Sequence, residues 1–272
     1  MTPIDAASHP FDDAIALIPD GPDRFSGRTH PAFRNMIGPF GGAIAATLLN
    51  GVLSHPDRRG DPLALTVHFA QPVAEGGFSV MSRILRSNRS SQHWQVELGQ
   101  KDGIAAFASI VTANRRESWG LTQAKAPAAP APDDLPAFPA VDGFAWTANY
   151  DMRFIEGGPG APASEQDPSR TVMWIGDRPF RPIDALSLSA LSDAFFPRIY
   201  IRRPALVPIG TVTLTVHFHT DAATLAGLRP GLLLGVAHAR HFGQGFFDQS
   251  AELWTADGTL LATSHQMVYF KE

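Results

Sequence analysis

The chain has 272 residues, of which 44% are hydrophobic and 18% are charged, with a formal net charge of −4 and no cysteine. This composition is typical of a folded protein with one large domain or two ordinary ones, and it excludes disulfides, thiolate zinc sites and a cysteine nucleophile. The mild acidity argues against a nucleic-acid partner. The sequence has no signal-peptide pattern and no run of about 18 apolar residues, so we expect a cytoplasmic protein with no membrane partner.

The first half predicts a helix followed by several strands. Apolar residues recur at helical spacing within 37–53, and a strand follows at 65–69 with the sequence Leu-Thr-Val-His-Phe. The Asp-Gly pair at 102–103 predicts a hairpin turn between two later strands. The segment 124–139 is rich in alanine and proline, which favours an extended linker over a helix or a central strand.

The second half repeats this order of elements. The pentapeptide returns unchanged at 214–218, which is 149 positions later, and the Asp-Gly pair returns at 257–258, which is 155 positions later. An insertion of about six residues in an early hairpin of the second copy reconciles the two spacings. Apolar residues at helical spacing predict one long helix over 186–201.

Two copies of one unit therefore make up the chain. We expect an N-terminal unit at 1–117, a linker at 118–145 and a C-terminal unit at 146–272 that carries the catalytic residues. In each unit an antiparallel sheet should wrap around a helix, because both elements must bury an apolar face. Strand alternation in the second copy predicts a polar face made of Thr211, Thr213, Thr215, His217 and His219.

Several enzyme classes are excluded by missing motifs. The sequence has no serine nucleophile elbow, no phosphate-binding loop, no complete dinucleotide-binding glycine pattern and no zinc-protease helix. His217 and His219 share a strand face without a third ligand, so we expect no metal and no bound cofactor. Asp193 is unusual because it lies in the middle of the predicted apolar helix. A buried carboxyl there needs partners, a raised pKa or a function, whereas an exposed stripe of the helix would explain it equally.

Three segments, taken in order, resemble one known family. They are Leu-Ser-Asp-Ala-Phe-Phe-Pro at 191–197, the strand at 210–219 that begins with Gly-Thr, and the segment 262–266 that ends in His-Gln. Together they resemble the double-hotdog, TesB-like (type II) acyl-CoA thioesterases, and the glycine-rich segment 38–42 is similar to the start of that family's first helix. The resemblance covers nearly the whole chain and implies an α+β fold, a tandem double hotdog.

The resemblance also implies a site and a substrate. Asp193, Thr211 and Gln266 would activate the water that hydrolyses an acyl-CoA thioester, in an enzyme of lipid metabolism. Gly41 and Gly42 would let the substrate approach a helix start, where backbone N–H groups polarise its carbonyl. Close packing of the helix backbone on the sheet is an alternative reason for glycine at these two positions.

Comparing the two copies predicts a single competent half-site. The repeat spacings align Asp193 with Ile44 and Gln266 with Val111, so the first copy lacks both polar groups. One chain already contains a pseudo-dimer, and its exposed faces could pair further to form a homo-oligomer.

Alternative functions remain at this stage. The chain could be a non-catalytic acyl-CoA-binding hotdog protein, because fold does not determine function. It could also be a hotdog enoyl-CoA hydratase or dehydratase, for which His265 is the nearest candidate, although alternation points it to the face opposite Gln266. The pairs Arg58–Arg59 and Arg202–Arg203 could meet coenzyme A phosphates or could be solvated loop charges.

Overall fold

The computed structural model describes residues 8–159, 168–203 and 206–272; part of the N-terminus used above lies outside these ranges. The strands of the first half are β1 (Ile18–Pro19), β2 (Arg24–Arg28), β3 (Asp61–Phe69), β4 (Gly77–Ser87), β5 (Ser91–Gln100) and β6 (Gly103–Ala113). Those of the second half are β7 (Tyr150–Glu156), β8 (Thr171–Asp177), β9 (Ile209–Phe218), β10 (Leu233–His238), β11 (Phe242–Gly243), β12 (Phe246–Trp254) and β13 (Leu260–Phe270). The α-helices are α1 (Pro10–Ala14), α2 (Gly41–Leu53), α3 (Ala185–Leu191), α4 (Arg198–Arg202) and α5 (Ala222–Ala226). Short 3₁₀ helices are η1 (Pro31–Phe33), η2 (Pro132–Asp134) and η3 (Ala145–Asn149).

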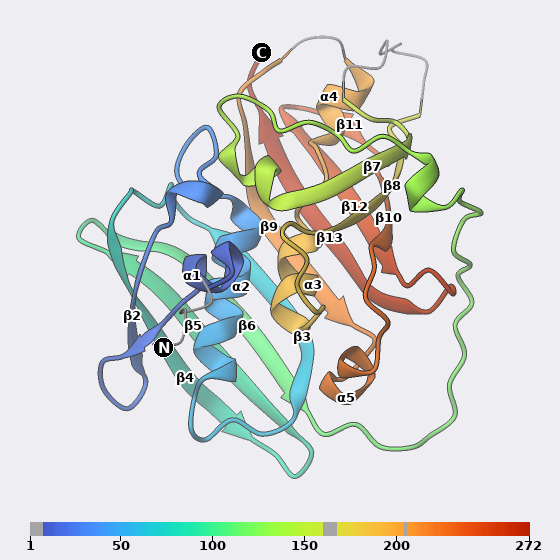
Figure 1. The fold of residues 1–272 in the computed structure, drawn as a ribbon. Coiled ribbons are helices and arrows are strands. Elements are labelled where there is room, and N and C mark those ends of the chain that lie inside the picture. Colours follow the sequence, from blue (N-terminus) through green and yellow to red (C-terminus); the bar gives the residue numbers. More distant parts are fainter. Residues whose placement is uncertain (1–7, 160–167, 204–205) are drawn as a thin grey trace, which may run out of the picture.

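One antiparallel sheet runs through both copies of the repeat (Figure 1). Its strand order is β1-β2-β4-β5-β6-β3-β9-β13-β12-β10-β8-β7, with β11 paired to β12. The two repeated pentapeptides lie in β3 and β9, which pair with each other at the centre of the sheet. Backbone hydrogen bonds therefore join the two copies directly.

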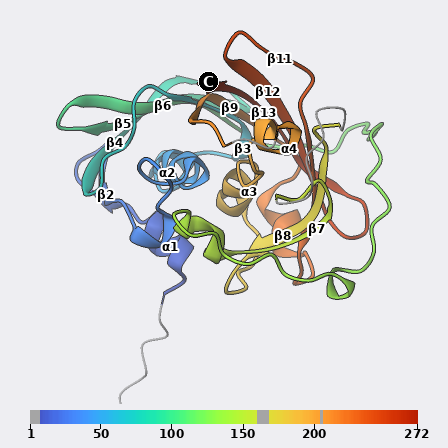
Figure 2. The ribbon, with the colours of Figure 1, turned by 90° about the horizontal axis from the view of Figure 1, so that it is seen from above.

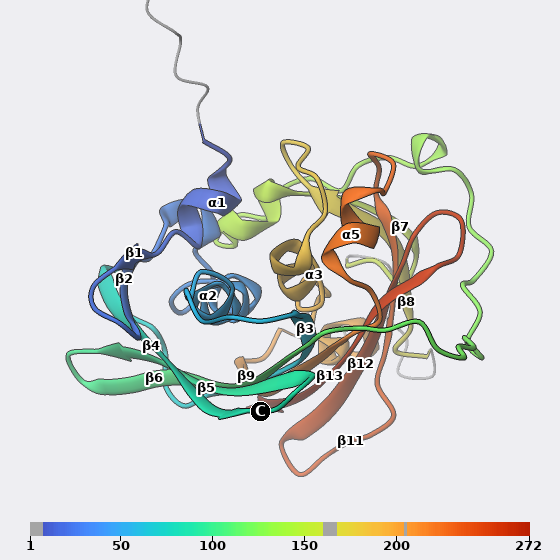
Figure 3. The ribbon, with the colours of Figure 1, turned by 90° about the horizontal axis from the view of Figure 1, so that it is seen from below.

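The helices α2 and α3 lie side by side in the hollow of the curved sheet (Figure 2). Nearly every residue of α2 is buried, because the sheet covers one side of the helix and α3 covers another. On the side away from the sheet, α1 and the segment before β7 cover the helices (Figure 3). No helix within the described ranges is long and apolar enough to cross a membrane.

The prediction of one long second helix is wrong. α3 ends at Leu191, and α4 is a separate short helix that Pro197 precedes as N-cap. A 3₁₀-type turn follows α3, in which the backbone N–H groups of Asp193 and Ala194 each donate to the carbonyl three residues earlier, both at 3.1 Å. Asp193 therefore lies in a turn just beyond a helix, and not in the middle of one.

The predicted insertion lies in a crossover connection rather than in a hairpin. The segment 219–232 joins β9 to β10, contains α5, and is longer than its counterpart 70–76 between β3 and β4. Since β9 and β10 are not neighbours in the sheet, the extra residues cross its end. Residues of the predicted linker pack along the second copy. The indole Nε1 of Trp174 donates a hydrogen bond to the carbonyl of Pro130 at 2.9 Å. The unit boundaries themselves stay predictions.

Candidate active site

Asp193, just beyond the end of α3, lies against the start of the neighbouring helix α2. A Cβ added to Gly41, the first residue of α2, would stand 2.6 Å from the Oδ2 atom of Asp193. The hydroxyl of Ser264 on β13 donates to the carbonyl of Ser192 at 3.2 Å, which fixes the turn before Asp193 to the sheet. The carboxylate therefore lies where the end of α3, the start of α2 and the inner face of β13 meet.

Gln266 reaches the same place from β13. Its side chain is 2% exposed, and its Oε1 atom accepts a long hydrogen bond of 3.5 Å from the hydroxyl of Thr211 on β9. Its Nε2 atom is buried and has no partner at ideal hydrogen-bond distance and angle among the residues that the structure describes. The amide still lies close enough to Asp193 to lower the pKa of that carboxyl. The three polar residues of the predicted site are thus brought together.

Thr211 faces the site because of a β-bulge. Strand alternation predicts that Thr211 lies on the same outer face as Thr213, and that prediction is wrong. The pairing of β9 with β13 shifts register at Val212, so that Thr213 pairs with Met267 but Thr211 pairs with Val268. One extra residue in a strand reverses the direction of the side chains beyond it. Thr211 therefore points inward, beside Gln266.

The first turn of α2 presents its positive end to Asp193. Phe40 is the N-cap of this helix and makes no side-chain cap hydrogen bond. The first N–H groups of a helix have no partner within the helix and lie at its positive end. The N–H of Gly42 faces the Asp193 carboxylate and lowers its pKa. Gly41 and Gly42, both predicted at this site, thus lie beside Asp193.

Burial dominates the electrostatics of the carboxylate. Removal from water raises the pKa of Asp193 to about 7, against the smaller opposing effects of Gln266 and the Gly42 N–H. At neutral pH both the protonated and the ionised forms of this carboxyl are therefore populated. A carboxyl in this state can accept a proton and return it within one reaction cycle.

Tyr150 is a neighbour of the site that the sequence did not single out. Its side chain is fully buried and contacts the ring of Phe40, and its hydroxyl lacks a hydrogen-bond partner among the described residues. Burial, together with the nearby carboxylates of Asp177 and Asp193, raises the pKa of Tyr150 well above its ordinary value. A lone tyrosine at the start of a strand carries no sequence signal that would have revealed this position.

The equivalent positions of the first copy are apolar. Gln266 pairs with Leu214, and the repeat equivalent of Leu214 is Leu65, which pairs with Ile110. The counterpart of Gln266 is therefore Ile110 rather than Val111, because bulges shift the strands. Counted from the first residues of α2 and α3, Asp193 corresponds to Leu49 rather than Ile44.

Other residues considered from the sequence lie elsewhere. His219 bonds to the Thr263 hydroxyl at 3.0 Å, and in the described part of the chain no three potential ligands gather as a metal site. His265 is exposed and bonds to the Ser250 hydroxyl at 2.9 Å, on the face opposite Gln266 as alternation predicts. Arg203 pairs with Glu272, and Arg58 lines a cavity at the far end of α2.

Solved structures share this architecture over almost the full chain. A conserved protein of unknown function with a hot dog fold from Alicyclobacillus acidocaldarius is 43% identical, with a TM-score of 0.93 over 97% of this chain and 99% of that one. A putative thioesterase II from Thermobifida fusca is 21% identical, with a TM-score of 0.84 over 98% and 99% of the two chains. The TesB protein of Mycobacterium avium subs paratuberculosis is 20% identical, with a TM-score of 0.77 over 96% and 98%. These similarities confirm the predicted double-hotdog fold.

Family comparison identifies both halves. The acyl-CoA thioesterase C-terminal domain matches residues 123–270, and the acyl-CoA thioesterase N-terminal domain matches residues 30–114. No curated protein matches the chain at a significant level. Because the C-terminal domain alone covers more than half of the sequence, the chain belongs to the acyl-CoA thioesterase family, as its resemblance to the TesB-like enzymes predicts.

Proposed function

We propose that this protein hydrolyses an acyl-CoA thioester to a carboxylic acid and coenzyme A, with Asp193, Thr211 and Gln266 acting on the attacking water. The observation that carries this proposal is the buried Gln266 amide, which acts as a hydrogen-bonding neighbour of the Asp193 carboxyl, whose burial raises its pKa to about 7. A buried amide and a buried carboxyl with a raised pKa, side by side, form a pair that can hold a water or a substrate oxygen, which supports a role in the reaction.

In the proposed reaction, water attacks the thioester carbonyl carbon while the ionised Asp193 carboxylate accepts one of its protons. The Gln266 amide orients the water, and Thr211 holds that amide through the hydrogen bond to Oε1. The positive end of α2, at Gly41 and Gly42, stabilises the oxyanion of the tetrahedral intermediate. As the intermediate collapses, the carbon–sulfur bond breaks and the proton on Asp193 passes to the departing thiolate. The products are the free acid and the thiol, and Asp193 is again ionised.

A Cβ at Gly41 would collide with this arrangement. It would stand 2.6 Å from Oδ2 of Asp193 and 3.5 Å from the ring of Phe69. Glycine therefore allows the carboxylate to lie directly against the helix start, where the positive end of α2 favours its ionised form. If Gly41 served only to pack α2 against its neighbours, the side of the helix that faces the Asp193 carboxylate would not need to lack a Cβ.

The test is a panel of acyl-CoA esters with thiol detection, run on the wild type and on Asp193→Asn. Loss of the general base should lower kcat by about 100- to 10,000-fold while the substrate still binds. The Asp177→Asn variant is the matched control, because it changes a second buried aspartate that lies outside the three-residue site. Full activity in Asp193→Asn would refute the assignment of the base. Tight acyl-CoA binding by the wild type without thiol release would favour the non-catalytic alternative.

A hydratase is less well supported. That chemistry needs a proton-transfer group beside the acid, and the predicted candidate, His265, is exposed on the other face of β13. Addition of water to an enoyl-CoA without release of thiol would reverse this preference.

A further inference from the structure

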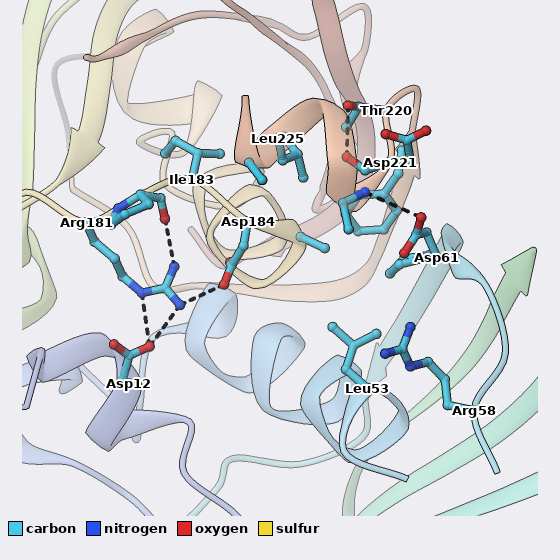
Figure 4. A pocket seen from close by; sticks show the side chains of 16 residues that line it. Asp12, Leu53, Arg58, Asp61, Arg181, Ile183, Asp184, Thr220, Asp221 and Leu225 are labelled. Atoms are coloured by element: carbon cyan, nitrogen blue, oxygen red, sulfur yellow. Dashed lines mark hydrogen bonds and ion pairs between the residues drawn. The ribbon is translucent and has the colours of Figure 1, made fainter. Parts of the chain in front are cut away.

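A cavity lies at the opposite end of the two central helices from Asp193. It has a volume of about 480 Å³ and is bordered by Leu53 at the end of α2 and by Ala185 at the start of α3 (Figure 4). The 13 residues of α2 span roughly 20 Å at 1.5 Å per residue, and Gly41 at its other end contacts Asp193. We call this space the distal cavity, and it is separate from the candidate active site.

The distal cavity is the repeat counterpart of the candidate active site. The equivalent of Thr211 is Pro62, since each precedes a bulge at the matching place in its strand, and Pro62 lines the cavity. Phe218, another lining residue, is the repeat equivalent of Phe69, which lies near Gly41. A twofold relation between the copies exchanges the two ends of the helix pair. The distal cavity and the candidate active site are thus related positions of the repeat, and only the second carries the polar residues of the site.

The distal cavity has lost those polar groups. The repeat counterparts of Asp193, Thr211 and Gln266 are Leu49, Pro62 and Ile110, which neither accept a proton nor orient water, and of these Pro62 lines the cavity. Its interior is apolar, with Leu53, Ile183 and Leu225 among the residues that line it. A volume near 500 Å³ with apolar walls is typical of sites for small organic ligands. Binding without thioester hydrolysis is the behaviour that this lining supports.

The charged residues that border the distal cavity, which we call its mouth, favour the binding of a cation over that of an anion. Asp61 and Asp221 border the cavity on the side of α5, and the hydrogen bond from the backbone N–H of Thr224 lowers the pKa of Asp221, so that carboxylate stays ionised. On the other side, the Arg181 guanidinium is paired with Asp12 and Asp184, at 2.9 and 2.7 Å (Figure 4). The remaining lining cation is Arg58, so the mouth carries four carboxylates against two guanidinium groups. Such a mouth repels the phosphates of coenzyme A and the carboxylate of a fatty acid.

We propose that the distal cavity binds a small amphiphilic cation, an amine in its ammonium form with an aliphatic or aromatic tail. The tail occupies the apolar space between the end of α2 and α5, and the ammonium group faces Asp61 and Asp221. This site is independent of the proposed hydrolysis, because it shares no residue with the candidate active site.

Three probes with one tail and different heads test the proposal by titration calorimetry: octylammonium, 1-octanol and octanoate. We expect octylammonium to bind with a stoichiometry of one, octanol to bind at least about fivefold more weakly, and octanoate not to bind. The Asp61→Asn variant should weaken octylammonium about tenfold and leave octanol unchanged. Equal or tighter binding of octanoate, or no binding of octylammonium, would overturn the proposal.

Two alanines of α5 provide a matched pair that locates the site. Ala226 is exposed and lines the cavity, whereas Ala223 is exposed on the same helix but is not among the lining residues. Ala226→Trp should abolish octylammonium binding, and Ala223→Trp should leave it intact. Binding should also be unchanged in Asp193→Asn, which separates this site from the site of hydrolysis. Loss of binding in Asp193→Asn, or retention in Ala226→Trp, would show that the amine binds elsewhere.

Discussion

The hydroxyls of Thr66 and Thr215 lie 3.1 Å apart across the pair of strands that joins the two copies of the repeat. These threonines hold the same position in the two pentapeptides, and they are also direct partners in the antiparallel ladder. Equivalent residues can pair with each other only on a twofold axis, so this hydrogen bond marks the pseudo-twofold axis of the chain.

The threonine pair should be energetically coupled. Thr66→Val or Thr215→Val should each lower the free energy of unfolding by about 1 kcal/mol, because the remaining hydroxyl loses its partner in a half-buried place. The double variant should lose less than the sum, since two valines leave no hydroxyl unpaired. Urea denaturation of the four proteins measures the coupling. Strictly additive losses would mean that the hydrogen bond contributes nothing.

Activity should depend on pH through Asp193. Its ionised form is the proposed base, and burial raises its pKa to about 7, so kcat should rise with pH up to about 7 and then level off. A pH–rate profile between pH 5.5 and 8.5 measures this rise. In Asp177→Asn the inflection should stay in place. A flat wild-type profile would argue against Asp193 as the group that titrates.

Thr211 should act through the orientation of Gln266. Thr211→Val removes the hydroxyl that donates to Oε1 at 3.5 Å, so the amide can rotate and kcat should fall about tenfold. Thr211→Ser keeps the donor and should retain most of the activity. Thr213→Val, on the outer face of the same strand, is the control for altered strand packing. Equal losses in the valine and serine variants would contradict a role for the hydroxyl.

Glycine at the start of α2 should matter for activity more than for stability. Gly41→Ala places a methyl group 2.6 Å from Oδ2 of Asp193 and should lower kcat/KM about 100-fold by displacing the carboxylate. Gly51→Ala is crowded in the same helix, with Ser82 Oγ at 2.7 Å, but it lies far from Asp193. It should destabilise the protein and leave the kinetics of the folded enzyme unchanged. Steady-state kinetics together with thermal unfolding separate the two effects.

Asp177 should destabilise the folded protein at neutral pH. Burial raises its pKa from 3.8 to about 6, although the Ser187 hydroxyl donates to it at 2.8 Å. The folded state therefore holds the proton more tightly than the unfolded state, and stability falls as the pH rises from about 4 to above 6. A pKa change of this size corresponds to roughly 3 kcal/mol. Asp177→Asn should remove that loss, so urea unfolding should show stabilisation at pH 8 and little change at pH 4.

Much of the architecture could be predicted from the sequence because it is repeated. The matching pentapeptides predict two units, and their central strands do pair in the structure. The second helix could not be predicted correctly, since the apolar periodicity of 186–201 continues through the turn at Asp193. Periodicity reports which residues are buried, and Ser192 and Ala194 in this turn are buried although the helix has ended.

The site could be predicted as a set of residues but not as a geometry. The resemblance names Asp193, Thr211 and Gln266, whereas alternation alone assigns Thr211 to the outer face. A bulge at Val212 corrects that assignment, and a bulge depends on pairing with another strand that no local pattern reveals. Tyr150 escaped notice for the same reason, because only the folded chain brings it near Asp193.

The ladder between β3 and β9 has a consequence for how this protein can be cut. A protease that cleaves the alanine- and proline-rich connection between the halves leaves every backbone bond of that ladder intact. The two fragments should then migrate together as a non-covalent heterodimer, held as firmly as neighbouring strands of any single sheet. Residues from both fragments, including Gly41 and Asp193, would still meet in one place.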